Sequence, residues 1–316
     1  MDNLYKINGT SNLHEEQNRG AYLDPNFWPN WNETINNFKL LLLDKNKKKE
    51  HFSLLRLGHS EMSAFFIGLN IDERVGNFYP RQSERKTVPQ DTLTKMFKSI
   101  NNASNTSTQI GYDFKNWIDK LMNFVEYYNK TKSVKGTEFI QYNNSLPRKN
   151  MNEIIDFPLE IIYGSIANKW LLKTFNNKIG LIGAREKLNC IKQLMEHKEY
   201  QDYLETNSFT DYIVIPQRAA LDLDLLENNI ENEIKNSNAE IFLIGAGVSK
   251  LKFFHLLNKY NKIFIDVGHG IDLLAGYGDK TRPYCGNWQN YRIKQNNPDF
   301  IDIMVGHDMM GDIIYL

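Results

Sequence analysis

Residues 240–270 read EIFLIGAGVSKLKFFHLLNKYNKIFIDVGHG and decide the fold. Two short apolar runs, at 241–244 and 263–265, end in glycine or aspartate, and a stretch with helical character lies between them. Strands that are apolar on both faces and joined by a helix are typical of a parallel sheet that helices cover on both sides. The segment therefore predicts a strand–helix–strand unit of an α/β domain.

The same alternation continues through the second half of the chain. Further apolar runs, which end in glycine, proline or a small residue, lie at 52–58, 160–164, 178–184 and 211–217. Stretches of helical character, at 185–204 and 224–236, follow the later runs. The sequence thus predicts an α/β, Rossmann-like fold, with a mostly parallel sheet flanked by helices.

The domain organisation follows from where this pattern begins. We expect residues 1–50 to form a polar N-terminal segment and a helix, which starts near residue 33, and residues 51–316 to form a single α/β domain. The region at about 70–110 has weak periodicity and a basic, proline-containing run, which predicts an irregular loop. Within it, NNASNTST at 101–108 has the composition of a linker.

The composition narrows the class of protein. Of the 316 residues 41% are apolar and 24% charged, with a formal net charge of zero, so no basic surface for nucleic acid is expected. No apolar run approaches the roughly 18 residues of a transmembrane segment. The chain has only Cys190 and Cys285 and shows no secretory signal, so we expect a cytoplasmic protein. The sequence leaves the oligomeric state open, a homodimer included.

Polar and glycine residues gather where the predicted strands end. In an open parallel sheet, ligands bind beyond the carboxyl ends of the strands. The residues at or after those ends are Arg56, Gly58, His59, Glu61, Gly183, Arg185, Gly245, Gly247, Val248, Asp266, Gly268, His269 and Asp272, with Arg282 in the glycine-rich segment that follows.

The glycine turn after the run at 241–244 admits a dinucleotide-type interpretation. Gly245 and Gly247 form a G-x-G pair, with Lys250 at the third position of that fingerprint. Asp266 follows about 20 residues later, where a dinucleotide-binding fold has its ribose-binding acid. An NAD(P)- or S-adenosylmethionine-dependent Rossmann enzyme therefore remains an alternative.

Three short motifs, taken in order, resemble the GT-D type glycosyltransferases, a sugar-nucleotide-dependent class on a modified Rossmann-like fold. The family's first motif is R-F-G-D-G-E, and residues 56–61 are R-L-G-H-S-E. An apolar strand into a glycine turn follows, here IFLIGAG at 241–247, and then D-I-G-H, here D-V-G-H at 266–269. The resemblance implies transfer of a hexosyl or related group from a nucleoside-diphosphate sugar, such as a UDP-sugar, to a glycan or glycoconjugate acceptor.

The resemblance also implies roles for particular residues. It makes Glu61, Asp266 and His269 candidates for catalysis. For substrate binding it implies Arg56, Gly58, Gly245, Gly247 and Gly268. We expect Gly183, Arg185, Val248, Asp272 and Arg282 to bind substrate as well, because they lie at or after the strand ends or in the glycine-rich segment that follows. The general base stays open among Glu61, Asp266, Asp272 and His269, as do the donor sugar, the acceptor and the stereochemical outcome.

A metal is implied by the first motif, whose acidic pair in the family is associated with a divalent cation and the donor diphosphate. In this chain His59 replaces the aspartate, so His59 and Glu61 are the candidate ligands. Imidazole and carboxylate suit Mn²⁺ and serve Mg²⁺ less well. Two alternatives follow from this departure: a metal-free site in which arginine and lysine hold the diphosphate, and a non-catalytic nucleotide-sugar-binding module.

Overall fold

The computed structural model describes twelve portions of the chain, to which every structural statement below refers. These are residues 31–58, 61, 64, 90–108, 123–124, 126–132, 162, 165–166, 169–216, 223–278, 288–294 and 313–316.

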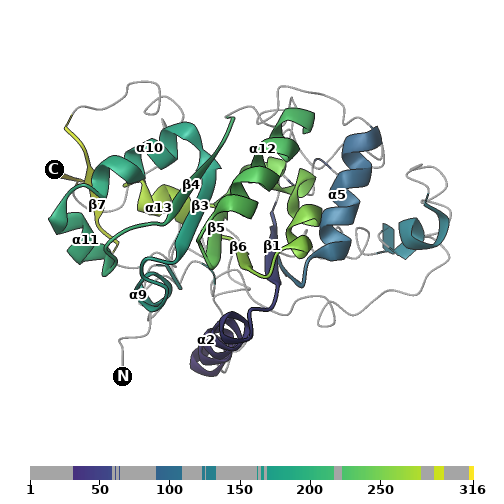
Figure 1. The fold of residues 1–316 in the computed structure, drawn as a ribbon, viewed down its shortest axis with the longest axis horizontal. Coiled ribbons are helices and arrows are strands. Elements are labelled where there is room, and N and C mark those ends of the chain that lie inside the picture. The colour runs from purple at the N-terminus through teal and green to yellow at the C-terminus, as the bar shows by residue number, and fades with distance from the viewer. Residues whose placement is uncertain are drawn as a thin grey trace, which may run out of the picture.

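A six-stranded parallel sheet forms the centre of the fold, with the strand order β2-β1-β6-β5-β3-β4 (Figure 1). Its strands are β1 (Phe52–Leu57), β2 (Asn105–Thr108), β3 (Ile179–Ala184), β4 (Asp211–Ile215), β5 (Ile241–Gly245) and β6 (Ile263–Asp266). All five strand pairings are parallel. The predicted α/β, Rossmann-like fold is therefore confirmed.

Two apolar cores sandwich the sheet because successive side chains of a strand point to opposite faces. In β5, Ile241 and Leu243 pack into one core, while Phe242 and Ile244 pack into the other. The first core includes side chains of α2 (Trp31–Lys48), α9 (Trp170–Thr174), α10 (Arg185–Leu194), α11 (Lys198–Leu204) and α13 (Gly270–Leu274). Both faces are thus covered, which explains the continuous apolar runs of the strands.

The second core is formed with α5 (Gln90–Asn102), α12 (Leu223–Asn236) and two 3₁₀ helices, η4 (Gly247–Lys252) and η5 (Phe254–Lys259). Figure 1 shows α5 and α12 on the side of the sheet opposite α10 and α11. The stretch between β5 and β6 is helical as expected, but in 3₁₀ form. A separate two-stranded parallel sheet pairs β7 (Asn290–Arg292) with β8 (Ile313–Tyr315).

The prediction of an irregular loop is wrong for residues 90–108, which form α5 and β2. In α5, Leu93, Met96, Phe97 and Ile100 are buried at helical spacing, but the polar residues between them obscure the pattern. The prediction of a linker at 101–108 is wrong as well, because α5 extends to Asn102 and β2 begins at Asn105. The sequence of β2, NTST, has no apolar pattern that would predict a strand, and the strand pairs with β1 through its backbone. Residues 70–89 and 109–110 lie outside the described residues.

The prediction of a strand at 160–164 is wrong at Ile162, which is helical. Ile162 and Ile166, four residues apart, are both fully buried in the first core. Ser165 Oγ donates to the Ile162 carbonyl oxygen at 2.6 Å. The described residues Ile162, Ser165 and Ile166 are therefore helical, and the rest of 160–164 lies outside the described residues.

Among the described helices, none combines the length and the apolar character that crossing a bilayer requires.

Candidate functional site

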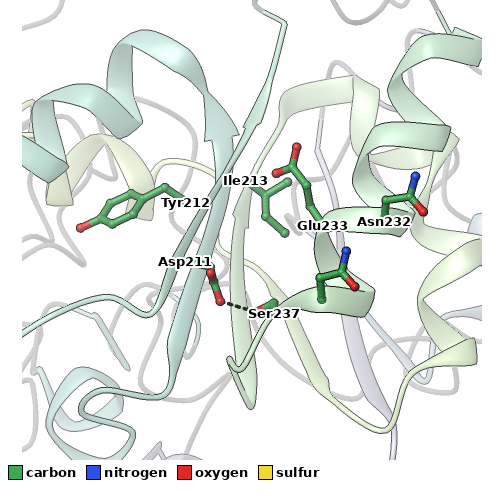
Figure 2. Close-up of a pocket in the computed structure, with 7 residues that line it drawn as sticks. Asp211, Tyr212, Ile213, Asn232, Glu233 and Ser237 are labelled. Atoms are coloured by element: carbon green, nitrogen blue, oxygen red, sulfur yellow. Dashed lines mark hydrogen bonds between the residues drawn. The ribbon is translucent and has the colours of Figure 1, made fainter.

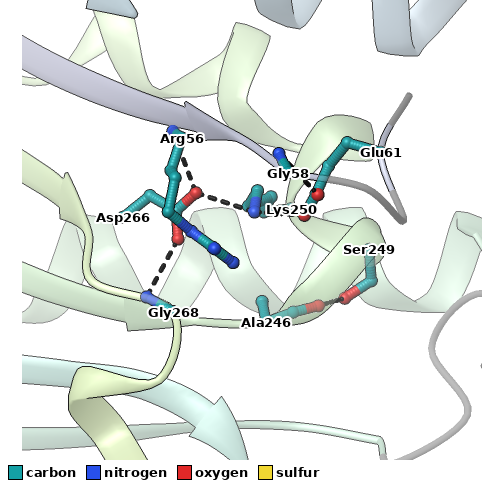
Figure 3. Close-up of polar contacts among 8 residues, drawn as sticks. All are labelled: Arg56, Gly58, Glu61, Ala246, Ser249, Lys250, Asp266 and Gly268. Carbon is teal, nitrogen blue, oxygen red and sulfur yellow. Dashed lines mark hydrogen bonds and ion pairs between the residues drawn. The ribbon is translucent and has the colours of Figure 1, made fainter. Parts of the chain in front are cut away.

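Four charged side chains meet where β1 and β6 end side by side, and we call Arg56, Glu61, Lys250 and Asp266 the carboxylate–lysine cluster (Figure 3). The Lys250 ammonium forms ion pairs with Glu61 Oε1 and with Asp266 Oδ2, the latter at 2.7 Å. The Lys250 and Asp266 side chains have no exposed surface, and that of Glu61 is only 2% exposed. A buried charge is tolerated only when it is paired in this way.

Backbone groups complete the coordination of both carboxylates. Glu61 Oε2 accepts the Gly58 N–H at 2.9 Å. Asp266 Oδ2 accepts the Arg56 N–H at 3.0 Å, and Oδ1 accepts the Gly268 N–H at 3.1 Å. Each of the four carboxylate oxygens therefore accepts at least one N–H.

The pKa of Glu61 reflects this environment. Burial raises the pKa of the Glu61 carboxyl, but the Lys250 ammonium and the Arg56 guanidinium oppose burial and hold that pKa at about 2. Glu61 is consequently a carboxylate at neutral pH, and its negative charge is part of the cluster.

Two glycines make room for the charged side chains of Arg56 and Glu61. Gly268 has a φ of +46°, and a Cβ there would lie 2.7 Å from Arg56 Nη2. A Cβ at Gly58 would lie 2.9 Å from Glu61 Oε2. Any larger residue at either position would displace a charged group, so these glycines of the first and last motifs shape the cluster.

A second cluster, the His–Asp–Lys cluster, consists of Lys187, His269 and Asp272. His269 Nδ1 lies 2.9 Å from Asp272 Oδ2, and the Lys187 ammonium pairs with Asp272 Oδ1. Lys187 comes from α10 and Asp272 from α13, so the pair ties the helix after β3 to the helix after β6.

The ionisation of the Asp272 carboxyl decides which nitrogen of His269 carries the proton. Burial raises the pKa of the Asp272 carboxyl, but Lys187 and the His269 hydrogen bond outweigh burial, and the net pKa lies well below its ordinary value. An ionised carboxylate only accepts hydrogen bonds, so the His269 Nδ1–H donates the hydrogen bond that Asp272 Oδ2 accepts. In the neutral imidazole, the lone pair is then on Nε2.

Gly183 and Gly245 serve packing. They face each other in the β3–β5 pairing, and a Cβ on Gly245 would overlap the Ile271 side chain. A Cβ on Gly183 would touch Ile271 at 3.6 Å. Because both positions lack a side chain, α13 can lie directly against the sheet, which sets the position of the His–Asp–Lys cluster above it.

The turn after β5 differs from the expected phosphate-binding turn. Gly247 is exposed with a φ of +52°, whereas Val248 is buried. Ser249 Oγ donates to the Ala246 carbonyl oxygen, and η4 begins where a dinucleotide fold has an α-helix. At the third fingerprint position, the buried Lys250 points into the carboxylate–lysine cluster (Figure 3).

The remaining predicted residues belong to neither cluster or lie outside the described residues. Arg185 is exposed at the start of α10, after the carboxyl end of β3. His59 and Arg282 lie outside the described residues. The predicted metal ligand His59 therefore stays a prediction.

Sequence reasoning missed the roles of two lysines, Lys250 and Lys187. Lys250 stood out only as a departure from the dinucleotide fingerprint. The useful signal was a charged residue in the apolar stretch VSKLKFF, at 248–254. Lys187 has no such signal, because it lies in the polar start REK of a helix.

A hollow of about 280 Å³ lies elsewhere, between β4 and α12 (Figure 2). It is lined by Asp211, Tyr212, Ile213, Asn232, Glu233, Asn236 and Ser237. Asp211 begins β4, and its carboxylate accepts a hydrogen bond from Ser237 Oγ (Figure 2). The hollow is therefore at the amino end of the sheet, opposite the edge where the two clusters lie.

The metal implied by the resemblance does not fit the carboxylate–lysine cluster as it is built. Within the described portions of the chain, no three histidine, cysteine, aspartate or glutamate side chains gather as metal ligands. Lys250 already lies between the Glu61 and Asp266 carboxylates, so a cation bridging them would have to displace a buried ammonium.

The fold is the property of the protein that its own structure establishes. Strand order and pairing establish a parallel α/β, Rossmann-like domain. No protein-family model matches the chain, and no curated protein and no solved structure matches it significantly.

Proposed function

We propose that the protein is a glycosyltransferase of the GT-D type, which transfers a sugar from a nucleoside-diphosphate donor to a glycan or glycoconjugate acceptor. One observation carries the proposal: the first and the last motif meet, although they lie about 200 residues apart in the chain. The Arg56 N–H donates to Asp266, the Arg56 guanidinium lies beside Gly268, and Lys250 joins Glu61 to Asp266. Ligands of open parallel sheets bind at this edge.

Arg56 is the residue best suited to the departing diphosphate. Glycosyl transfer develops negative charge on the leaving group, which a fixed cation stabilises. Lys250 is fully buried and cannot reach a ligand, whereas Arg56 keeps part of its surface exposed. Arg185, exposed at the amino end of α10, supplies a second cation at the same edge, where the helix dipole also favours an anion.

His269 is the residue best suited to accept the proton of the acceptor hydroxyl. Both Glu61 and Asp266 are occupied by Lys250 and backbone N–H groups. Asp272 is engaged by Lys187 and by the imidazole. That hydrogen bond orients the ring and places its proton on Nδ1, which makes Nε2, itself buried, the basic nitrogen, in the manner of other His–Asp pairs.

The dinucleotide alternative is disfavoured by the burial of Asp266. A ribose-binding acid must reach a hydroxyl of the ligand, but this carboxylate is fully buried and binds Lys250, Arg56 N–H and Gly268 N–H. Lys250 also takes the position at which the fingerprint has its third glycine, which serves close packing of helix and strand.

Ligand screening by thermal shift tests the proposal. UDP-, GDP-, dTDP- and CMP-sugars are compared with NAD(P) and S-adenosylmethionine, and at least one sugar nucleotide is expected to raise the unfolding temperature. Arg56→Gln should weaken that stabilisation, whereas the control Lys192→Gln, an exposed lysine on α10, should not. Stabilisation by NAD(P) or S-adenosylmethionine alone would contradict the proposal.

An assay for release of the nucleoside diphosphate follows with the stabilising donor. Release that depends on an acceptor, or slow hydrolysis of the donor, is expected of a transferase. Binding without release across a broad panel of acceptors would instead identify a non-catalytic nucleotide-sugar-binding module.

A further inference from the structure

The cation held by the Glu61 and Asp266 carboxylates is an ammonium of the protein. We infer that Lys250 takes the place of a divalent metal at this site, and that the protein binds its ligand without a metal bridging Glu61 and Asp266. The inference about the cation concerns the chain alone, while its consequence for the donor rests on the proposed function.

The geometry of Lys250 is that of a bridging cation. Its Nζ contacts one oxygen of each carboxylate, and the two carboxylates come from the ends of different segments, after β1 and at the end of β6. A divalent ion in such a site would use the same oxygens. Figure 3 shows the lysine side chain reaching from the turn after β5 to both acids.

The remaining carboxylate oxygens are occupied as well. Glu61 Oε2 and Asp266 Oδ1 accept backbone N–H groups of Gly58 and Gly268, at 2.9 and 3.1 Å. A metal at these atoms would have to replace donors that the main chain fixes. Moreover, Lys250 has no exposed surface, so its ammonium cannot simply swing into solvent to admit an ion.

The charge balance also favours the ammonium. Two carboxylates, one ammonium and the Arg56 guanidinium sum to zero formal charge in the cluster. Replacing the ammonium by a divalent ion would leave an excess of one positive charge in a buried site. With the lysine in place, the donor diphosphate must instead be neutralised by protein cations at the open side, first of all by Arg56.

Titration of the wild-type protein with Mn²⁺ provides the first test. Mn²⁺ alone is added while electron paramagnetic resonance measures the free ion, and unfolding temperatures are recorded with Mn²⁺ and with EDTA. We expect no stoichiometric Mn²⁺ binding that depends on Glu61, and no change of the unfolding temperature in EDTA. One Mn²⁺ per chain, lost in Glu61→Gln, would overturn the inference.

Removal of the lysine provides the converse test. Lys250→Ala leaves two carboxylates facing an empty space, and we expect it to gain one Mn²⁺ site and a higher unfolding temperature when Mn²⁺ is added. The double variant Lys250→Ala with Asp266→Asn lacks one ligand and should lose that gain. Folded Lys250→Ala that ignores Mn²⁺ would contradict the idea that the ammonium fills a cation site.

The outcomes stay separate from those of the proposed function. Neither experiment uses a nucleotide, so a failure to bind sugar nucleotides leaves the metal result unaffected. Where Lys250→Ala does not fold, the wild-type titration still decides the inference. A Mn²⁺ ion that persists in Glu61→Gln lies elsewhere on the chain and leaves Lys250 as the cation of this cluster.

Discussion

Two charged clusters lie at the same edge of the sheet, and they differ in how far water reaches them. In the carboxylate–lysine cluster, the Lys250 and Asp266 side chains are fully buried and Glu61 is 2% exposed. In the His–Asp–Lys cluster, Lys187 is 23%, Asp272 13% and His269 10% exposed. The buried Glu61, Lys250 and Asp266 side chains can hold geometry but cannot meet a ligand, so Arg56 is the member of that cluster left to do so, whereas all three side chains of the His–Asp–Lys cluster keep some exposed surface.

The largest expected effect on stability comes from breaking the carboxylate–lysine cluster. Lys250→Ala leaves two carboxylates buried without their cation, and should lower the free energy of unfolding by about 3–5 kcal/mol. Urea denaturation measures this change. The control Lys259→Ala removes an exposed lysine paired with Glu231 at 2.7 Å, and should cost less than about 1 kcal/mol. Equal losses in the two variants would contradict the contrast in burial.

Breaking the His–Asp–Lys cluster should affect turnover more than stability. His269→Ala should lower kcat roughly 10²- to 10⁴-fold, the usual contribution of a general base, with donor binding retained. Asp272→Asn is expected to lower kcat less and to change its pH profile, because the amide no longer fixes the imidazole proton on Nδ1. Unchanged turnover in His269→Ala would remove this residue from the mechanism.

Acid should separate Glu61 from an ordinary surface carboxylate. Its pKa falls from 4.5 in the unfolded chain to about 2 in the folded one. Between these values the unfolded chain binds a proton that the folded chain does not, so the contribution of Glu61 is full above 4.5 and is lost as the pH falls towards 2. Urea denaturation at a series of pH values between about pH 6 and pH 3 measures the free energy of unfolding. That free energy should fall less steeply with falling pH in Glu61→Gln than in the wild type.

Sequence reasoning succeeded where a local pattern dictates structure. The apolar runs of β5 and β6 and the glycines after them predicted a parallel sheet with a polar edge. Arg56, Asp266 and Gly268 were expected at that edge because the carboxyl ends of parallel strands meet there, and the structure brings them together.

The parts that could not be predicted depend on tertiary contacts. The strand β2, with the sequence NTST, pairs with β1 through its backbone, and such pairing requires no apolar pattern in the sequence. A fully buried lysine is rare, so nothing local predicts that Lys250 turns inward; only the two acids from distant segments explain it. The ion pair of Lys187 could not be predicted either, because its partner Asp272 lies on another helix.

The contact between Arg56 and the glycines at 58 and 268 has a consequence for conformational entropy. A free arginine side chain loses up to roughly 2 kcal/mol of rotamer freedom when it is immobilised. Here the guanidinium lies against Gly268, so much of that loss occurs when the chain folds. An anion that binds Arg56 therefore meets a preorganised partner, and more of the interaction free energy appears as affinity.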